Sequence, residues 1–335
     1  MSFHPLLFGC FGYFTIDGLT KGYKWGWMIE TKCTCLVDGN FIFWRAYHTP
    51  GMNLSHRCDR CRVAGANDPK CPVCAGTGRE PTKATYGFIR EILSILKESR
   101  PRQLAVVFDG PRGELRRRAI WPGYKANRDD NDDPGVTWQM IRIKEILRTM
   151  GVCVVECRGH EADDALATLA VRCATQNRTV TIITRDKDIR QLCSDRRIKC
   201  FDPVSKTTYD WITAGKKWGI RTRQIFDMLV LSGDGTDGIP GIMGIGEKTA
   251  AKLLQLYRNV DGVIAAANGG LLTPKTAESI KNAVARGYID RNKTLVQLDR
   301  NISFQPGTLV MRTKRINLSA SVPLFKALGF RSLLG

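Results

Sequence analysis

The stretch that most constrains this chain is Gly159-His160-Glu161-Ala162-Asp163-Asp164, which places three carboxylates within four residues. Apolar residues follow it at helical spacing and predict a helix that begins here: Leu166, Leu169, Ala170 and Cys173. Carboxylates this close raise one another's pKa unless positive charge lies between them. The N-terminus of a helix favours anions but cannot neutralise three of them, so the stretch predicts a bound divalent cation. The alternative is a solvated acidic first turn of a helix.

The composition indicates a polyanionic partner. Lys and Arg number 51 against 32 Asp and Glu, which gives the 335-residue chain a net charge of +19. A surface of this charge usually neutralises phosphates, so nucleic acid is the expected partner. An acidic membrane surface would also fit the charge, but no run of about 20 apolar residues exists, and a membrane-spanning helix is excluded. We interpret residues 1–32 as an N-terminal extension outside the fold.

Four predicted strands are each followed by acidic residues. The strands are Cys33–Val37, Leu104–Phe108, Val152–Val155 and Thr179–Thr184, and the acids are Asp38, Asp109, Glu161, and Asp186 with Asp188. Helices are predicted between them, one over 137–150 and one after Thr82, whose side chain we expect to cap it. This alternation predicts an α/β domain with a mostly parallel central sheet flanked by helices. Ligands bind at the carboxyl ends of such strands, so the acids are expected to converge there.

Four cysteines within residues 54–80 form two Cys-x2-Cys pairs, Cys58 with Cys61 and Cys71 with Cys74. Four thiolates at this spacing can close a tetrahedral zinc site, and the metal can fold a segment too small and polar to fold alone. We therefore expect one structural zinc ion, with redox chemistry as the alternative. The chain has 12 cysteines in all but no export signal, which favours a reducing, cytoplasmic location.

The segment 111–135 interleaves basic and aromatic residues. Its basic residues include Arg116, Lys125 and Arg128, and its aromatic residues are Trp121 and Tyr124. Basic side chains can follow a nucleic-acid backbone while rings stack on bases, so the pattern is typical of a surface that binds single strands. The alternative is a solvated loop with a charge run.

Beyond about residue 218 the pattern becomes helical. Asp234 and Asp237 lie in a Gly-rich turn, and Gly244 and Gly246 then lead into a helix that carries Lys248. Such a turn lets the backbone approach a phosphate closely, with helix N–H groups aimed at it. This is the pattern of a helix-hairpin-helix contact with the backbone of duplex DNA. A packing corner between two helices is the alternative.

In this order, these motifs resemble those of the 5′-nuclease family, which comprises flap endonucleases, bacteriophage 5′-3′ exonucleases and the 5′-nuclease domain of bacterial DNA polymerase I. The matching motifs are Leu36-Val-Asp38-Gly, Val107-Phe-Asp109-Gly, Tyr124-Lys-Ala-Asn-Arg128, Gly159-His-Glu-Ala-Asp-Asp164, Thr184-Arg-Asp186-Lys-Asp188, Ser232-Gly-Asp-Gly-Thr-Asp237-Gly-Ile-Pro-Gly and Gly244-Ile-Gly-Glu-Lys-Thr-Ala250. The resemblance implies a PIN-like 5′-nuclease fold. The resemblance also divides the chain into a catalytic α/β domain over 33–218, a helical DNA-binding subdomain over 219–300, and a segment over 301–335 that packs back on the core.

The resemblance also implies a set of site residues. Nine acids would hold two or more Mg²⁺ or Mn²⁺ ions: Asp38, Asp109, Glu161, Asp163, Asp164, Asp186, Asp188, Asp234 and Asp237. Lys125 and Arg128 would be catalytic residues that contact the scissile phosphate from an arch, the segment 111–135, through which the 5′ end passes. Further DNA contacts would come from Arg116, Tyr124, Gly244, Gly246, Lys248 and Thr249, with K⁺ held by backbone carbonyls of the hairpin.

The implied function is metal-dependent hydrolysis of DNA near 5′ ends, on flaps, nicks or branched duplexes, during replication, repair or recombination in a bacterial or phage-infected cell. Two alternatives stay open: a nuclease that removes RNA primers from RNA/DNA hybrids, and a DNA-binding protein without catalysis. The chain departs from the family at His160, where Tyr is common, and in its added cysteine segment, which bears on substrate preference. No polymerase domain follows, so we expect the protein to act alone or with partners that the sequence does not identify.

Overall fold

The computed structural model describes residues 33–50, 54–58, 60–61, 71, 73–74, 77–110, 116–126, 133–304, 309 and 311–334. The predictions for residues 1–32 and for Arg128 lie outside these ranges. Within them, no helix combines the length and the apolar character that crossing a bilayer requires.

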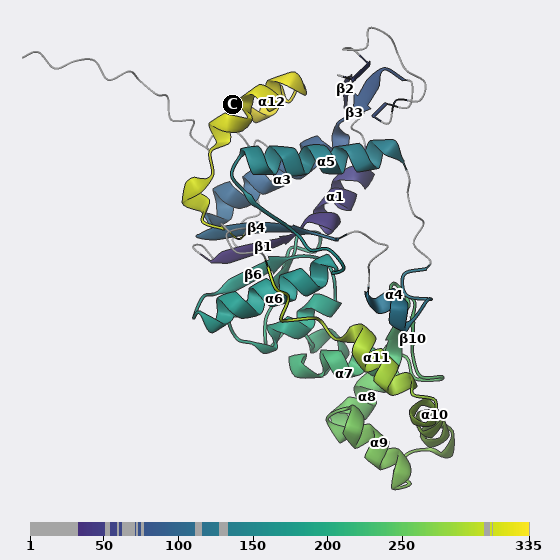
Figure 1. Cartoon of the computed structure of the whole chain (residues 1–335). Coiled ribbons are helices and arrows are strands. Elements are labelled where there is room, and N and C mark those ends of the chain that lie inside the picture. Colours follow the sequence, from purple (N-terminus) through teal and green to yellow (C-terminus); the bar gives the residue numbers. More distant parts are fainter. Residues whose placement is uncertain are drawn as a thin grey trace, which may run out of the picture.

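Figure 1 shows a six-stranded sheet between two layers of helices. Its strands are β1 (Thr34–Asp38), β4 (Gln103–Phe108), β5 (Cys153–Glu156), β6 (Val180–Ile183), β7 (Ile198–Asp202) and β8 (Thr207–Tyr209). They lie in the order β5-β4-β1-β6-β7-β8, and all neighbours are parallel except β7 and β8. The chain runs outward from β1 to β5 and then returns to β6, so the topological switch point lies between β1 and β6. The predicted α/β architecture is confirmed.

Both faces of the sheet are buried, which explains why its strands are continuous apolar runs rather than alternating ones. Cys35 and Val37 face the helices α1 (Gly39–His48), α3 (Lys83–Ser99) and α5 (Pro134–Thr149), whereas Leu36 faces α6 (Ala162–Thr175). The segment after residue 311 returns to the first of these layers. There Phe325 and Phe330 are buried in the same core cluster as Cys35 and Val37.

The second half of the chain is mostly helical. It contains α7 (Ile225–Ser232), α8 (Glu247–Tyr257), α9 (Val260–Asn268), α10 (Pro274–Ala285), α11 (Tyr288–Val296) and α12 (Val322–Ala327), with two short paired strands, β9 (Gly233–Asp234) and β10 (Ile239–Pro240). Asn292 of α11 is fully buried, and its amide donates to the carbonyls of Val230 at 3.1 Å and Pro240 at 2.8 Å. This buried amide fixes α11 against α7 and β10.

The structure differs from the sequence-based prediction in its additional strands and in the cap of α3. Strands β7 and β8 are additional, because short segments such as Thr207–Tyr209 have no periodicity that predicts a strand and are held by pairing with their neighbours. The second difference is at α3, where the Thr82 side chain makes no capping hydrogen bond. Instead, Gln139 of α5 accepts hydrogen bonds from the N–H groups of Ala84 at 2.8 Å and Thr85 at 3.4 Å. The expected Thr82 cap is therefore wrong.

We predict that Gln139→Ala lowers the free energy of unfolding by about 1–2 kcal/mol, because two buried N–H groups lose their acceptor. Thr82→Val, which removes the hydroxyl but keeps the volume, should change it by less than about 0.5 kcal/mol. Urea unfolding followed by circular dichroism measures both. A larger loss in the Thr82 variant than in the Gln139 variant would contradict the assignment of the cap.

Candidate metal centre and nucleic-acid interface

The predicted acids come from elements that meet at the carboxyl edge of the sheet, around the switch point. Asp38 ends β1, Asp109 follows β4, and Asp186 and Asp188 follow β6. Asp234 ends β9, Asp237 lies in the turn between β9 and β10, and the remaining acids start α6: Glu161, Asp163 and Asp164.

Asp38 and Asp109 are each fixed by hydrogen bonds from nearby elements. Asp38 accepts from the N–H of Phe41 at 3.0 Å and from the Thr184 hydroxyl at 2.8 Å. Asp109 accepts from the Asn40 amide and, at 2.8 Å, from the N–H of Ala162. The first N–H of α6 thus donates to Asp109, the carboxylate that follows β4, whereas the N-cap residue Glu161 makes no side-chain cap hydrogen bond. These bonds hold both carboxylates at the carboxyl edge of the sheet.

Burial and mutual repulsion dominate the electrostatics of the group. Burial, opposed by hydrogen bonds and assisted by Asp109 and Asp186, raises the pKa of Asp38 to about 7. Burial and neighbouring carboxylates likewise raise the pKa values of Asp163, Asp186 and Asp188. Asp186 repels acids on both sides, because it raises the pKa values of Asp38 and Asp163 as well as that of Asp188. Asp186 therefore interacts electrostatically with Asp38, Asp163 and Asp188.

The residues present suit divalent cations. All donors of the group are carboxylate oxygens, which are the ligands that Mg²⁺ and Mn²⁺ prefer. Asp188 Oδ1 is buried and has no hydrogen-bond partner among the described residues. A buried anionic oxygen without a donor is costly unless a cation binds it.

Arg117 of α4 (Arg116–Ile120) binds two of the predicted metal ligands, Glu161 and Asp164. Its guanidinium donates to Asp164 at 2.7 and 2.8 Å, to Glu161 at 2.7 Å, and to the carbonyls of Leu295 and Gln297 at 2.8 Å. Asp164 also accepts from the N–H of Asp299 at 2.8 Å. The structure thus gives Asp164 a cation and a backbone donor as partners, while its neighbour Asp163 faces the other acids.

Tyr124 and Lys125 also lie on Glu161. The Tyr124 hydroxyl donates to Glu161 at 2.7 Å, and the Lys125 ammonium pairs with Glu161 and lies 3.7 Å from Asp237. Burial alone would raise the pKa of Glu161. The positive charges of Lys125 and Arg117 outweigh this effect and lower the pKa below its ordinary value. Tyr124 is only 2% exposed, so its ring cannot serve as the base-stacking surface that the sequence suggested. The physical reason is that its hydroxyl is drawn to a buried carboxylate.

The segment that carries Lys125 is docked on the turn between β9 and β10. Lys125 has a left-handed backbone, with φ of +51°, and its N–H donates to the carbonyl of Asp237 at 2.8 Å. Trp121 donates from its indole N–H to the carbonyl of Gly238 at 2.9 Å. A Cβ added at Gly238 would lie 2.4 Å from the carbonyl oxygen of Gly123, so only glycine permits this contact. Arg128 lies outside the described residues.

The hairpin before α8 is exposed and is linked to the acids. Gly244 has φ of +78°, and a Cβ added at Gly244 or Gly246 would meet no atom within 4 Å, so the turn is open to a partner. Lys248 is exposed and Thr249 is half-buried. Lys187 lies 3.5 Å from Asp234 and 3.4 Å from Glu247, the first residue of α8. A single ammonium group therefore connects the start of this helix with the acid group.

A cavity of about 720 Å³ lies next to Glu161 and Asp164, between α4, the start of α6 and α11. Its lining includes the basic residues Arg116, Lys293 and Arg300. The side chain of Arg116 is 70% exposed. Positive charge therefore adjoins the acids on the side toward the helical subdomain.

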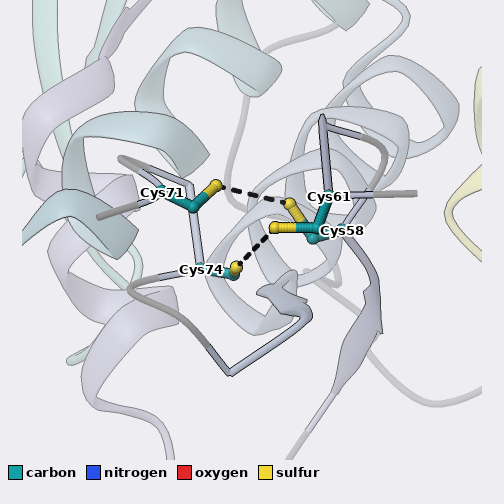
Figure 2. Close-up of side chains that lie close together, drawn as sticks. All are labelled: Cys58, Cys61, Cys71 and Cys74. Atoms are coloured by element: carbon teal, nitrogen blue, oxygen red, sulfur yellow. Dashed lines mark hydrogen bonds between the residues drawn. The ribbon is translucent and has the colours of Figure 1, made fainter. Parts of the chain in front are cut away.

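The four cysteines lie between β2 (Ser55–Arg57) and β3 (Arg79–Pro81), and Figure 2 shows their sulfur atoms close together. All four are buried, and their sulfur atoms lie within 4.8 Å of one another. Burial raises the pKa of the Cys71 thiol, but hydrogen bonds from the N–H groups of Val73 and Cys74 and from neighbouring thiols outweigh this effect and lower it to about 7. The cluster can therefore hold a metal ion that prefers thiolates.

Three residues that hold the acids were not predicted as site residues. Arg117 binds Glu161 and Asp164, Thr184 binds Asp38, and Asn40 binds Asp109. A weak signal existed for two of them, because Asn40 and Thr184 each lie two residues from a predicted acid in the sequence. For Arg117, one basic residue among several, the sequence offers no such signal.

A parallel sheet with carboxylates at its switch point and a helical subdomain beside them is typical of metal-dependent nucleases. The chain belongs to the 5′-3′ exonuclease family, because residues 33–219 match its N-terminal resolvase-like domain and residues 220–317 match its C-terminal SAM-fold domain. The predicted family is confirmed. A 5′-3′ exonuclease of Aquifex aeolicus is 32% identical over 257 residues, which are 76% of this chain and 84% of that protein. The thermostable DNA polymerase I of Thermus thermophilus is 37% identical over 185 residues, and the match spans only 22% of its length.

Solved structures share the fold. The 5′-exonuclease of bacteriophage T5 with bound zinc ions has a TM-score of 0.59 at 21% identity, covering 79% of this chain and 89% of that one. The catalytic core of Rad2 in complex with a DNA substrate has a TM-score of 0.54 at 17% identity and covers 90% of each chain. At these identities, the likeness establishes the fold alone.

We predict that Mg²⁺ stabilises the protein more at high pH than at low pH. Because the pKa of Asp38 rises from 3.8 to about 7 on folding, the stability that its protonation supports is complete below the unfolded pKa and is lost as pH rises through about 7. A cation replaces the lost protons. Mg²⁺ added after EDTA treatment should therefore raise the melting temperature by about 5 °C near pH 8 and by less than about 2 °C near pH 5.5.

Asp261→Asn is the matched control, because this side chain is 78% exposed and lies in α9. It should keep the pH-dependent difference. Equal gains at both pH values in the unsubstituted protein would show that protons and cations do not compete for these carboxylates.

Proposed function

We propose that this chain is a divalent-metal-dependent 5′ nuclease that hydrolyses DNA phosphodiester bonds near 5′ ends. The observation that carries the proposal is the group of buried and half-buried acids around Asp186 at the switch point, with Lys125 held beside them. Membership of the 5′-3′ exonuclease family supports it. We propose 5′ flaps, nicked duplexes and branched duplexes as substrates, and RNA/DNA hybrids as a further one. The T5 flap endonuclease with DNA and metal ions is a structural relative that supports this choice.

Mg²⁺ or Mn²⁺ is the proposed cofactor, with two ions or more. One set of ligands would be Asp38, Asp109, Asp163 and Asp186, and the other would be Asp188, Asp234 and Asp237 together with the shared Asp186. When bound, such a pair of ions supplies an activated water and neutralises charge on the leaving oxygen. Glu161 and Asp164 are each paired with the Arg117 guanidinium, and Glu161 is also paired with the Lys125 ammonium. We therefore assign these two acids to holding the arch segment.

Lys125 is proposed to contact the scissile phosphate. Its ammonium lies beside Glu161 and Asp237, so it is already held at the edge of the acid group before substrate arrives. A cation placed there in advance can offset charge that develops on the phosphate in the transition state. Arg128, from the same family motif, is proposed to assist it.

The remaining DNA contacts are proposed for two surfaces. Arg116, at the rim of the basic cavity, would bind phosphates of the strand near the acids. Gly244, Gly246, Lys248 and Thr249 would bind the backbone of the duplex, where exposed N–H groups at a helix start favour phosphate. K⁺ at the hairpin carbonyls is part of this proposal.

We expect the wild-type protein to cleave a 5′-labelled flap in Mg²⁺, and product lengths on flap, nicked and blunt substrates will separate flap cleavage from exonuclease action. Asp163→Asn should reduce the rate by about 1,000-fold or more, because it removes a charge that holds metal. DNA affinity should change less than about threefold. Unchanged turnover in Mg²⁺ would refute the metal assignment, and DNA binding without any cleavage by the wild-type protein would favour a non-catalytic role.

Lys125→Ala should slow the single-turnover rate on the order of 100-fold and weaken duplex binding far less, because the side chain is buried beside the acids. Lys326→Ala, an exposed lysine of α12, is the matched control and should leave both quantities unchanged. Rapid-quench kinetics and fluorescence anisotropy give the two measurements. Equal losses in rate and in affinity would count against the proposed role of Lys125.

A further inference from the structure

The geometry of the four cysteines matches a closed tetrahedral zinc site. The sulfur atoms of Cys58 and Cys71 lie 3.8 Å apart, and those of Cys61 and Cys74 lie 3.5 Å apart. Four thiolates about 2.3 Å from one zinc ion would be separated by about 3.8 Å. Cysteine would fill all four positions of such a tetrahedron, which would leave no open position for substrate.

The hairpin that carries these cysteines has only a small hydrophobic cluster of its own. Strands β2 and β3 are three residues long each. Within the described part of the chain, Trp138 of α5 is the partly buried hydrophobic residue that packs against the cysteine cluster. Hairpins of this size are marginal in water, so a metal would supply most of their order.

Contacts between this hairpin and α5 are close and specific. Arg142 pairs with the buried Glu80 of β3 at 3.2 Å, and its guanidinium lies 5.2 Å from the centre of the Trp138 ring. A Cβ added at Gly135 would lie 3.0 Å from Pro81 Cγ. The hairpin therefore lies on the first turns of α5, as Figure 1 also shows.

The first turns of α5 are where the chain leaves the arch segment. Asp133 caps α5 through the N–H of Gly135 at 2.8 Å and accepts from the Tyr47 hydroxyl of α1 at 3.1 Å. Gln139, one turn further, binds the start of α3. The other end of the same segment is fixed at the acids by Arg117 and Lys125. The cysteine hairpin thus supports the end of the arch segment that lies away from the acids.

We infer that Cys58, Cys61, Cys71 and Cys74 bind one Zn²⁺ and that this ion, through Trp138 and Glu80, holds the start of α5 and so sets the position of the arch. The consequence for cleavage rests on the proposed nuclease function, whereas the binding and the ordering do not. Loss of zinc should affect substrates whose single strand must pass the arch more than substrates without one.

The first experiment measures bound zinc and amide exchange on the full chain. Wild-type protein and Asp186→Asn should each retain one zinc per chain after dialysis against EDTA, and Cys71→Ser should retain none. Asp186→Asn is included because the acids could also bind zinc. Removal of zinc should speed amide exchange at the start of α5 and at Ala84 and Thr85 by about tenfold or more, while β1 and β6 remain protected. Absence of zinc from the wild-type protein, or unchanged exchange after its removal, would overturn the inference.

A second variant separates the ion from its contact with α5. Trp138→Ala should keep the zinc but lose protection at the start of α5, whereas Trp138→Phe should keep both. In Mg²⁺, both zinc removal and Trp138→Ala should lower flap cleavage at least about fivefold more than cleavage at a nick. Equal losses on the two substrates would refute the coupling to the arch. If the wild-type protein cleaves no substrate, the nuclease proposal is refuted. The zinc content and the amide exchange would still decide whether zinc holds the start of α5.

Discussion

The repulsion among carboxylates buried at one edge of the sheet is the constraint on which the rest of the structure depends. The protein holds three of these carboxylates with backbone N–H donors: Asp38 accepts from Phe41, Asp109 from Ala162, and Asp186 from Asp188. These bonds orient the acids but do not neutralise them, because a backbone N–H carries only a partial charge. Burial and mutual repulsion outweigh the hydrogen bonds at Asp38 and Asp186, whose pKa values are raised.

The cations that oppose this repulsion also join the parts of the molecule. Arg117 binds Glu161 and Asp164 while donating to carbonyls at the end of α11. Lys187 lies between Asp234 and Glu247, where the hairpin enters α8. Arg117 therefore connects the acids with the end of α11, and Lys187 connects them with the start of α8, which is proposed to bind DNA.

Much of the fold could be predicted because its signals are local. The apolar strands followed by Asp38, Asp109 and Asp186 are visible in the sequence, and so is the acidic start of α6. The failures share one cause, which is dependence on a distant partner. Gln139, not Thr82, caps α3, and Tyr124 is buried because its hydroxyl reaches a carboxylate 37 residues away. The strands β7 and β8 are likewise defined by what they pair with.

The sequence by itself determined which side chains could bind cations: the acids after the strands and the two cysteine pairs. Only the tertiary structure decided how they are used, and Asp163 and Asp164 show why. Neighbouring residues on a helix point about 100° apart, so one of these two carboxylates faces the other acids while the next meets Arg117. Whether a carboxylate is left for a metal or held by an arginine depends on what packs against that face of the helix. In this protein α4 packs against the Asp164 face of α6, and its Arg117 lies 47 residues before Asp164 in the chain.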